Sequence, residues 1–163
     1  MHFSTLLLPL MVLATVSGTE TKDCNVSSCY ASPLPPLSPL SLTTSRPTPW
    51  GKPAFTLPNG TLCCDSLTQV RAGINAIDAQ LVELLAQRAA FVREATRFKR
   101  TIDSIDVPAR DREVIEGAVN ASRKTEPRLP ETIARAVFEA IINASVPFEE
   151  CVFGESEAGC GEE

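Results

Sequence analysis

The sequence lacks the features by which three common classes of protein are recognised. Its apolar runs stay short of the roughly 20 residues that a membrane-spanning helix needs, so we expect no membrane partner. Basic residues are not in excess, because 15 Lys and Arg stand against 20 Asp and Glu and leave a net charge of −5. This balance argues against a nucleic-acid partner, which usually requires a clustered basic face. Histidine occurs once, at His2, which argues against a zinc site of Cys and His ligands.

Cysteine, by contrast, is abundant for a chain of 163 residues. Six cysteines accompany a single Trp and a single Tyr, which is unusual in a cytosolic enzyme and indicates an oxidising compartment. The apolar run Leu6–Ala14, followed by the small residues Val16–Gly18, is typical of a signal peptide. We therefore predict a signal peptide at residues 1–18 and a secreted, extracellular protein; a buried N-terminal helix is the alternative. Four N-x-S/T sequons agree with that route, beginning at Asn25, Asn59, Asn120 and Asn143.

Residues 19–64 are interpreted as a Pro-rich arm that contains cysteines. Eight of the 13 prolines lie between residues 24 and 60, with Ser and Thr around them. Because proline has no N–H donor, this segment favours neither a helix nor a central strand. An extended linker is the plain interpretation, and docking of Pro33–Pro36 into an aromatic groove is the alternative.

The cysteines lie outside the predicted helices or at their ends, at positions 24, 29, 63, 64, 151 and 160. We interpret them as disulfides that tie the arm and an acidic tail at residues 154–163 to the folded part. Zinc ligands are the minor alternative. Because adjacent cysteines rarely join each other, we expect no bond between Cys63 and Cys64.

From residue 65 onwards the apolar pattern is helical. Apolar residues recur at spacings of three and four from Leu67 to Phe98, which predicts a heptad seam on one helix about 50 Å long. That seam needs other helices or a second copy to cover it. Shorter helices are predicted from Pro108 to about Arg123 and from Pro130 onwards, and no segment alternates like a strand. The prediction is an all-α fold of one long and two short helices over residues 65–153.

Three cations on the long helix are candidates for a functional site. Arg88 interrupts the apolar seam, where an unpaired guanidinium is costly. Lys99 follows on the same side of the helix, about 16 Å away, so the two side chains can hold a small polyanion between them. The alternative is an internal carboxylate for Arg88 and solvent for Lys99. Arg71 lies about 25 Å before Arg88, so it serves such a site only from another chain and is otherwise a surface arginine.

These residues resemble the first helix of the all-α, type II chorismate mutases. Val70–Arg88 and Ala95–Lys99 carry that family's pattern: an Arg, an Asp seven residues later, an Arg closing a Leu-Leu-x-x-Arg run, and a Lys 11 residues beyond it. Arg112-Glu113 and the run Phe138–Glu149 match the second and third helices. The resemblance covers about residues 66–153. It implies an intertwined homodimer with two sites, each completed by an Arg of the partner chain, and conversion of chorismate to prephenate without a metal or cofactor.

The resemblance assigns four residues to catalysis. Arg88 would bind a substrate carboxylate, and Lys99 would donate to the ether oxygen, which gains negative charge as its bond to carbon breaks. Glu113 would hold the ring hydroxyl. Glu149 would be the second donor to the ether oxygen, which requires that its carboxyl group is protonated. We therefore expect better activity at mildly acidic pH and a flatter pH profile for Glu149→Gln.

Three further residues would bind substrate: Arg71 of the partner chain on the second carboxylate, Arg112 in support of the anion site, and Ser145 at its edge. Two departures from the family pattern affect these assignments. Ala109 stands where an Asp is frequent, and Pro147 removes a helical N–H between Ser145 and Glu149. The position of Glu149 therefore depends on how the helix passes Pro147.

Three functions compete. The leading hypothesis is a secreted chorismate mutase, whose export implies action on the shikimate-pathway pool of a host or neighbouring cell. The second is an isochorismate pyruvate lyase on the same scaffold, against which Glu113 and Glu149 argue. The third is a non-catalytic effector or binding protein, which gives no physical reason to keep Arg88 in an apolar seam.

Overall fold

The computed structural model describes residues 26–37, 39, 45, 47–49, 51–53 and 55–157. The predicted signal peptide, Cys24, Asn25 and Cys160 lie outside these residues. Three α-helices dominate the described part: α2 (Leu67–Thr96), α3 (Pro108–Ser122) and α4 (Glu131–Glu157). The predicted all-α fold is confirmed. None of the described helices has the length and apolarity needed to cross a membrane.

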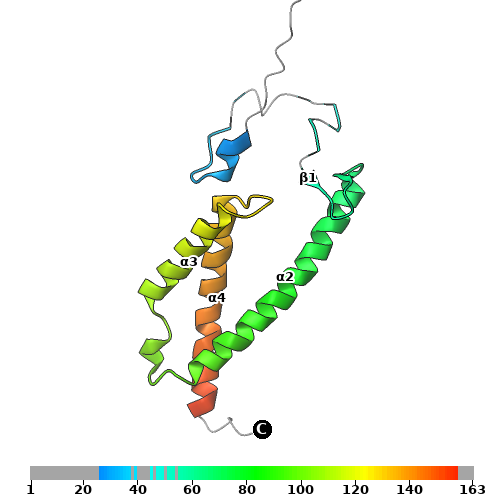
Figure 1. Ribbon diagram of the computed structural model, residues 1–163. Coiled ribbons are helices and arrows are strands. Elements are labelled where there is room, and N and C mark those ends of the chain that lie inside the picture. The colour runs from blue at the N-terminus through cyan, green and yellow to red at the C-terminus, as the bar shows by residue number, and fades with distance from the viewer. Residues whose placement is uncertain are drawn as a thin grey trace, which may run out of the picture.

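The helices are arranged so that α4 contacts both of the others. α3 packs along α4, and α2 meets α4 only near the C-terminal ends of both helices (Figure 1). The N-terminal half of α2 diverges from the pair, and every residue from 65 to 87 is exposed. A short 3₁₀ helix, η2 (Ile102–Ser104), lies in the connection from α2 to α3. The sequence prediction that the seam of α2 needs a further partner is consistent with this exposure.

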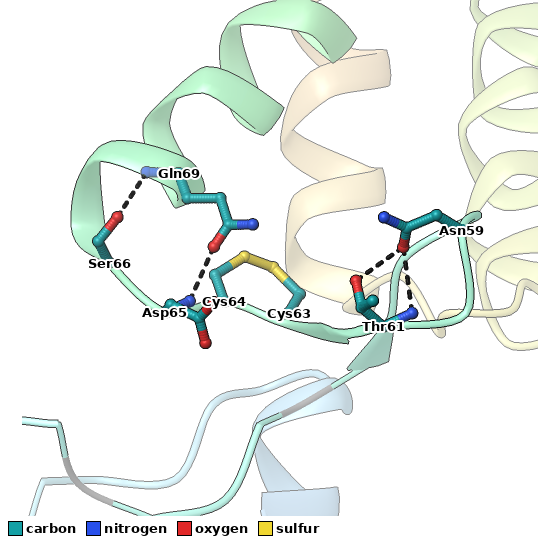
Figure 2. The surroundings of a disulfide bond; sticks show 7 residues. All are labelled: Asn59, Thr61, Cys63, Cys64, Asp65, Ser66 and Gln69. Carbon is teal, nitrogen blue, oxygen red and sulfur yellow. Dashed lines mark hydrogen bonds between the residues drawn. A yellow bond between two sulfur atoms is a disulfide. The ribbon is translucent and has the colours of Figure 1, made fainter.

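The start of α2 is fixed by side chains on its first turn. Ser66 is the N-cap, and its hydroxyl accepts a hydrogen bond from the backbone N–H of Gln69 at 3.2 Å. The Gln69 side chain reaches back and accepts from the backbone N–H of Asp65 at 2.8 Å (Figure 2). The Gln69 N–H, one of the donors that a helix N-terminus leaves without partners, is therefore satisfied, as is the N–H of the residue before the cap.

The Pro-rich arm contains regular structure that the sequence did not predict. Val26–Tyr30 forms a 3₁₀ helix, η1, and Phe55–Thr56 (β1) pairs antiparallel with Leu62–Cys63 (β2). The hairpin forms because the intervening residues close a turn: Gly60 adopts φ 83°, and its N–H donates to the Leu57 carbonyl at 2.8 Å. The expectation of no strand is wrong at this one short ladder.

The disulfide expectation is wrong for the adjacent cysteines. Cys63 and Cys64 form a disulfide with each other, and their Cα atoms lie 3.1 Å apart across a cis peptide bond (Figure 2). This bond therefore links neighbours at the start of α2 and does not tie the arm to the helices. Cys29 and Cys151 are free and exposed.

α4 is longer than the short helix that the sequence predicted. It spans 27 residues and continues past Pro147 and Gly154, so it includes the first residues of the predicted acidic tail. The helix survives Pro147 because a proline removes one N–H donor but leaves the other bonds of the turn intact. Against α4, α3 buries Val119 and Ser122, and α4 contributes Ala134 and Phe153 to the buried set.

Candidate functional site

The C-terminal third of α2, the start of α3 and the middle of α4 surround a cavity of about 450 Å³. This volume lies within the range of about 300–1,000 Å³ that is typical of small-molecule sites. Its walls combine apolar side chains with charged groups from all three helices. The apolar lining residues are Phe91, Val92, Ala95, Ile105, Val107, Val114, Ile142 and Val146, and the polar ones are Arg88, Lys99, Arg110, Asp111, Ser145 and Glu149.

Arg88 lies on this cavity with a neutral partner. Its Nη1 donates to Ser145 Oγ at 2.7 Å, and the Ser145 hydroxyl in turn donates to the Ile141 carbonyl at 2.7 Å. α4 therefore fixes the orientation of the guanidinium without neutralising it. The alternative considered for Arg88, a carboxylate partner, is not what the structure shows. A half-buried guanidinium with a hydroxyl partner retains its charge for an anion.

Lys99 does have a carboxylate partner. Its Nζ lies 2.7 Å from Glu149 Oε1 and donates a hydrogen bond to the Ile105 carbonyl at 3.1 Å. Both side chains are largely buried, and Glu149 Oε1 accepts no well-directed hydrogen bond from the described residues. Lys99 lies just after α2, where the backbone N–H of Lys99 donates to the Thr96 carbonyl. The helix therefore ends three residues before the position expected, yet Lys99 still reaches the cavity.

Pro147 does not displace Glu149 from the site. α4 is continuous through Pro147, so Ser145 and Glu149 remain four residues apart on one helical face. Both contact cations of α2, at Arg88 and at Lys99 respectively. The uncertainty that the proline introduced in the sequence is therefore resolved in favour of Glu149.

α3 contributes the pair Arg110 and Asp111 to the cavity, whereas the pair expected there was Arg112 and Glu113. The face of α3 toward the cavity begins at Val107 and continues through Arg110, Asp111 and Val114, which follow helical spacing. Arg112 and Glu113 are exposed and do not line the cavity. Glu113 forms an exposed ion pair with Arg110 at 2.8 Å. The expected roles of Arg112 and Glu113 are therefore not supported by their positions in this chain.

The sequence did contain a signal for Arg110 and Asp111. The stretch Arg110-Asp111-Arg112-Glu113 repeats an Arg–acid dipeptide two residues apart, so the pattern fits in two registers. Counting from Pro108 at the first turn, residues 107, 110, 111 and 114 share a face that carries valines at both ends. The helical periodicity of the apolar residues therefore favours the register of Arg110-Asp111 over that of Arg112-Glu113. The spacing from Lys99 does not distinguish these two registers.

Asp111, which lines the cavity, has a raised pKa. Burial raises the pKa of its carboxyl group, and the charge of Asp106 and a hydrogen bond with Asp106 raise it further. The cations Lys99 and Arg112 oppose this shift. The protonated form of Asp111 is therefore favoured over that of an ordinary aspartate, which makes it a hydrogen-bond donor over a wider pH range.

Arg71 lies far from the cavity of its own chain. It precedes Arg88 by 17 residues on the same helix, which is about 25 Å. It is exposed on the part of α2 that diverges from α4. Of the seven predicted site residues, the structure thus brings together Arg88, Lys99, Ser145 and Glu149. Arg71, Arg112 and Glu113 lie apart from them.

The fold and this site define a class: a small all-α domain in which three helices hold cations over a partly apolar cavity. The family model of chorismate mutase type II matches residues 70–150, which contain α3, most of α2 and most of α4. The chain belongs to the chorismate mutase type II family through this domain. Membership supports chorismate mutase activity and a connection to aromatic amino acid biosynthesis. No curated protein matches the chain.

Proposed function

We propose that this protein is a chorismate mutase, an isomerase that rearranges chorismate to prephenate in the cavity between α2, α3 and α4. The observation that carries the proposal is the convergence of Arg88 and Lys99 on a partly apolar cavity of small-molecule size. In this rearrangement the ether C–O bond breaks while a C–C bond forms within one molecule, so no co-reactant is needed. The site has to hold the reactive conformer and stabilise the charge that develops on the ether oxygen.

The charges of the cavity suit a substrate with two carboxylates. Three cations, Arg88, Lys99 and Arg110, line the cavity together with two acidic side chains, Asp111 and Glu149. The net charge is +1 with both acids ionised and +2 with Glu149 protonated. Arg71 of a second chain would add one further positive charge, and a positive cavity suits a dianion. An apolar wall strengthens such ionic contacts because it excludes water.

We assign the roles accordingly. Arg88, oriented by Ser145, binds one carboxylate in bidentate fashion, and Arg71 of the partner subunit binds the other. Lys99 donates to the ether oxygen, and Glu149 is the second donor, a role that its carboxyl group can take only in the protonated form. Arg110 and Asp111 take the anion-supporting and hydroxyl-holding roles that the sequence gave to Arg112 and Glu113, because they line the cavity.

The supply of Arg71 from a partner requires a homodimer, which we also propose. The exposed face of α2 carries a row of large apolar residues that the described part of the chain leaves uncovered: Leu67, Val70, Ile74, Ile77, Leu81 and Leu84. These are the seam positions of the heptad pattern, whose natural partner is another copy of the same helix. The same half of α2 carries Arg71, so pairing there also moves Arg71 toward another chain's cavity.

We further propose that the protein is exported and acts on chorismate outside the cell that makes the enzyme. The signal-like N-terminus, the six cysteines and the four sequons support export. Cleavage after Gly18 predicts that the protein recovered from the medium begins at Thr19, which N-terminal sequencing measures directly.

The activity is tested by following chorismate by absorbance with the purified, disulfide-intact protein at pH 5 and pH 7.5. We expect conversion to prephenate, and a loss of about 10²–10³-fold in kcat/KM for Arg88→Ala, since one anion contact is removed. Arg93→Ala is the matched control, because Arg93 is exposed in the last turn of α2 and does not line the cavity. Pyruvate release from isochorismate would favour the lyase, and no turnover by a folded protein would favour a binding protein.

A further inference from the structure

Three of the four sequons lie within the described residues, and they differ in what the hydroxyl group of the third residue does. N-glycosylation requires an N-x-S/T triplet on an accessible surface. All three asparagines, Asn59, Asn120 and Asn143, are exposed. Accessibility of the asparagine therefore does not distinguish them, whereas the state of the hydroxyl does.

In the sequon Asn59-Gly60-Thr61 the hydroxyl engages the asparagine itself. Thr61 Oγ1 donates to Asn59 Oδ1 at 2.7 Å, and the Thr61 backbone N–H donates to the same oxygen at 3.1 Å. Figure 2 shows Oδ1 turned toward Thr61, with no hydrogen bond drawn to the amide nitrogen. Both donors polarise the amide and orient it so that Nδ2 is free for an incoming group.

The space around this triplet is open. Asn59 lies in the turn between β1 and β2, ahead of the first turn of α2. A Cβ added at Gly60 would meet nothing within 4 Å. The turn is closed by residues 57–61 alone, so it forms without the packing of the helices. A bulky glycan therefore has room there both before and after the chain folds.

The other two sequons lack this arrangement. The hydroxyl of Ser122, third residue of the Asn120 triplet, is buried and donates to the Val119 carbonyl at 2.8 Å. Asn120 Oδ1 instead accepts from Arg123. The hydroxyl of Ser145, third residue of the Asn143 triplet, donates to a carbonyl of α4 and accepts from Arg88. Both hydroxyls donate to a backbone carbonyl of their own helix, so neither contacts the asparagine of its sequon.

We propose that Asn59 is an N-glycosylation site of this protein and that Asn120 and Asn143 are not. The donor is a lipid-linked oligosaccharide pyrophosphate of the secretory pathway. A bond forms between Asn59 Nδ2 and C1 of the first sugar, the C1–O bond to the pyrophosphate breaks, and the lipid pyrophosphate leaves with the electron pair. Nδ2 loses one proton to a base of the transferase. The inference rests on the proposed export and is independent of the proposed chemistry in the cavity.

The test is to produce the full chain, with its own N-terminus, in a eukaryotic secretory host and to measure occupancy of each sequon. Enzymatic deglycosylation in ¹⁸O-water converts each glycosylated Asn to labelled Asp, which peptide mass spectrometry locates. We expect the label at Asn59, its complete loss in Thr61→Ala, and its retention in the conservative variant Thr61→Ser. Asn120→Gln and Asn143→Gln are the matched controls and should leave the label at Asn59 unchanged.

Two results would overturn the inference. One is a secreted chain without label at Asn59, and the other is label at Asn120 or Asn143 equal to that at Asn59. A chain that stays in the cytosol without glycan refutes it together with the proposed export. The chorismate assay is run on the same protein, so a glycosylated chain without turnover refutes the activity and leaves the glycan assignment in place.

Discussion

Arg88 and Lys99 lie on the same cavity but have partners of different charge. Ser145 holds Arg88 through a neutral hydroxyl, whereas Glu149 meets Lys99 as an ion pair. The sequence left two interpretations open: a small polyanion held between both cations, or an internal carboxylate for Arg88 and solvent for Lys99. It did not predict which partner each would have, since that depends on the rotation of α4 against α2. That rotation is a property of packing, which residue spacing within one helix does not encode.

At the scale of single residues, Glu149 gives the first prediction. Its carboxyl group faces Lys99 and Arg88 of α2 and lies on the same cavity as Arg110 and Asp111 of α3. If only its protonated form donates to the ether oxygen, the rate falls with rising pH. Glu149→Gln donates at any ordinary pH, so its kcat profile from pH 5 to 8 should be flatter. A wild-type rate that is constant over this range would contradict the prediction.

At the scale of elements, the ends of α3 and α4 are joined by a charge cluster remote from the cavity. Arg123, at the C-cap of α3, donates to both carboxylate oxygens of Glu131, each at 3.0 Å, and Arg128 donates to Oε1 at 3.3 Å. The Arg128 guanidinium also lies 5.9 Å from the ring centroid of Tyr30. This cluster therefore connects α3, α4 and the 3₁₀ helix of the arm.

The cluster predicts a pH-dependent contribution to stability. The hydrogen bond from Arg123 is the main reason why the pKa of Glu131 is lowered. A lowered pKa means that the folded protein binds the proton less tightly than the unfolded chain, so the stabilisation is present above about pH 4 and is lost as the pH falls through the folded-state pKa. Glu131→Gln should therefore lower Tm at pH 7, and the difference from wild type should shrink toward pH 3.

Glu116→Gln is the control for this experiment. Glu116 forms an ion pair with Arg135 between the same two helices at 2.8 Å, but both side chains are exposed. Exposed pairs contribute only about 0–1 kcal/mol, so little change in Tm is expected. Equal effects of the two substitutions, or a Glu131→Gln effect that persists at pH 3, would show that ionisation of Glu131 is not the cause.

The elements themselves were predictable to different degrees. The 3-4 spacing from Leu67 located α2, and Pro108 and Pro130 located the starts of α3 and α4 within a residue. The continuation of α4 from residue 154 to residue 157 was not predicted, because Gly154 opens an acidic, Gly-rich segment that was assigned to a tail. Arg112 and Glu113 match the family pattern, whereas Arg110 and Asp111 line the cavity together with Val107 and Val114, because packing sets the rotation of α3.

At the scale of the whole molecule, the proposed dimer makes a quantitative prediction. Arg71→Ala and Arg88→Ala should each be nearly inactive alone, because each removes one carboxylate contact from every site. In dimers that combine the two variants, one site receives both substitutions and the other receives neither. With random pairing half of the dimers are mixed, and half of their sites are intact, so co-expression should restore about a quarter of wild-type activity.

Size-exclusion chromatography with light scattering gives the mass of the assembly in the same samples. If Arg71 acted within its own chain, a mixed dimer would contain no complete site and mixing would restore nothing. That outcome, or a wild-type protein that is fully active as a monomer, would refute the contribution of Arg71 in trans. A Lys52→Ala partner, which changes an exposed cation of the arm, controls for nonspecific effects of co-expression.

The diverging half of α2 has a consequence for where the enzyme can work. A cavity completed by a neighbouring chain is complete only while the two chains stay together, so activity per chain falls when dilution exceeds the dissociation constant. The proposed export would expose the protein to such dilution as soon as it leaves the cell. The apolar row from Leu67 to Leu84 would then have to hold the proposed dimer together at trace concentrations. The stability of this contact would then set the lowest protein concentration at which the chain is active.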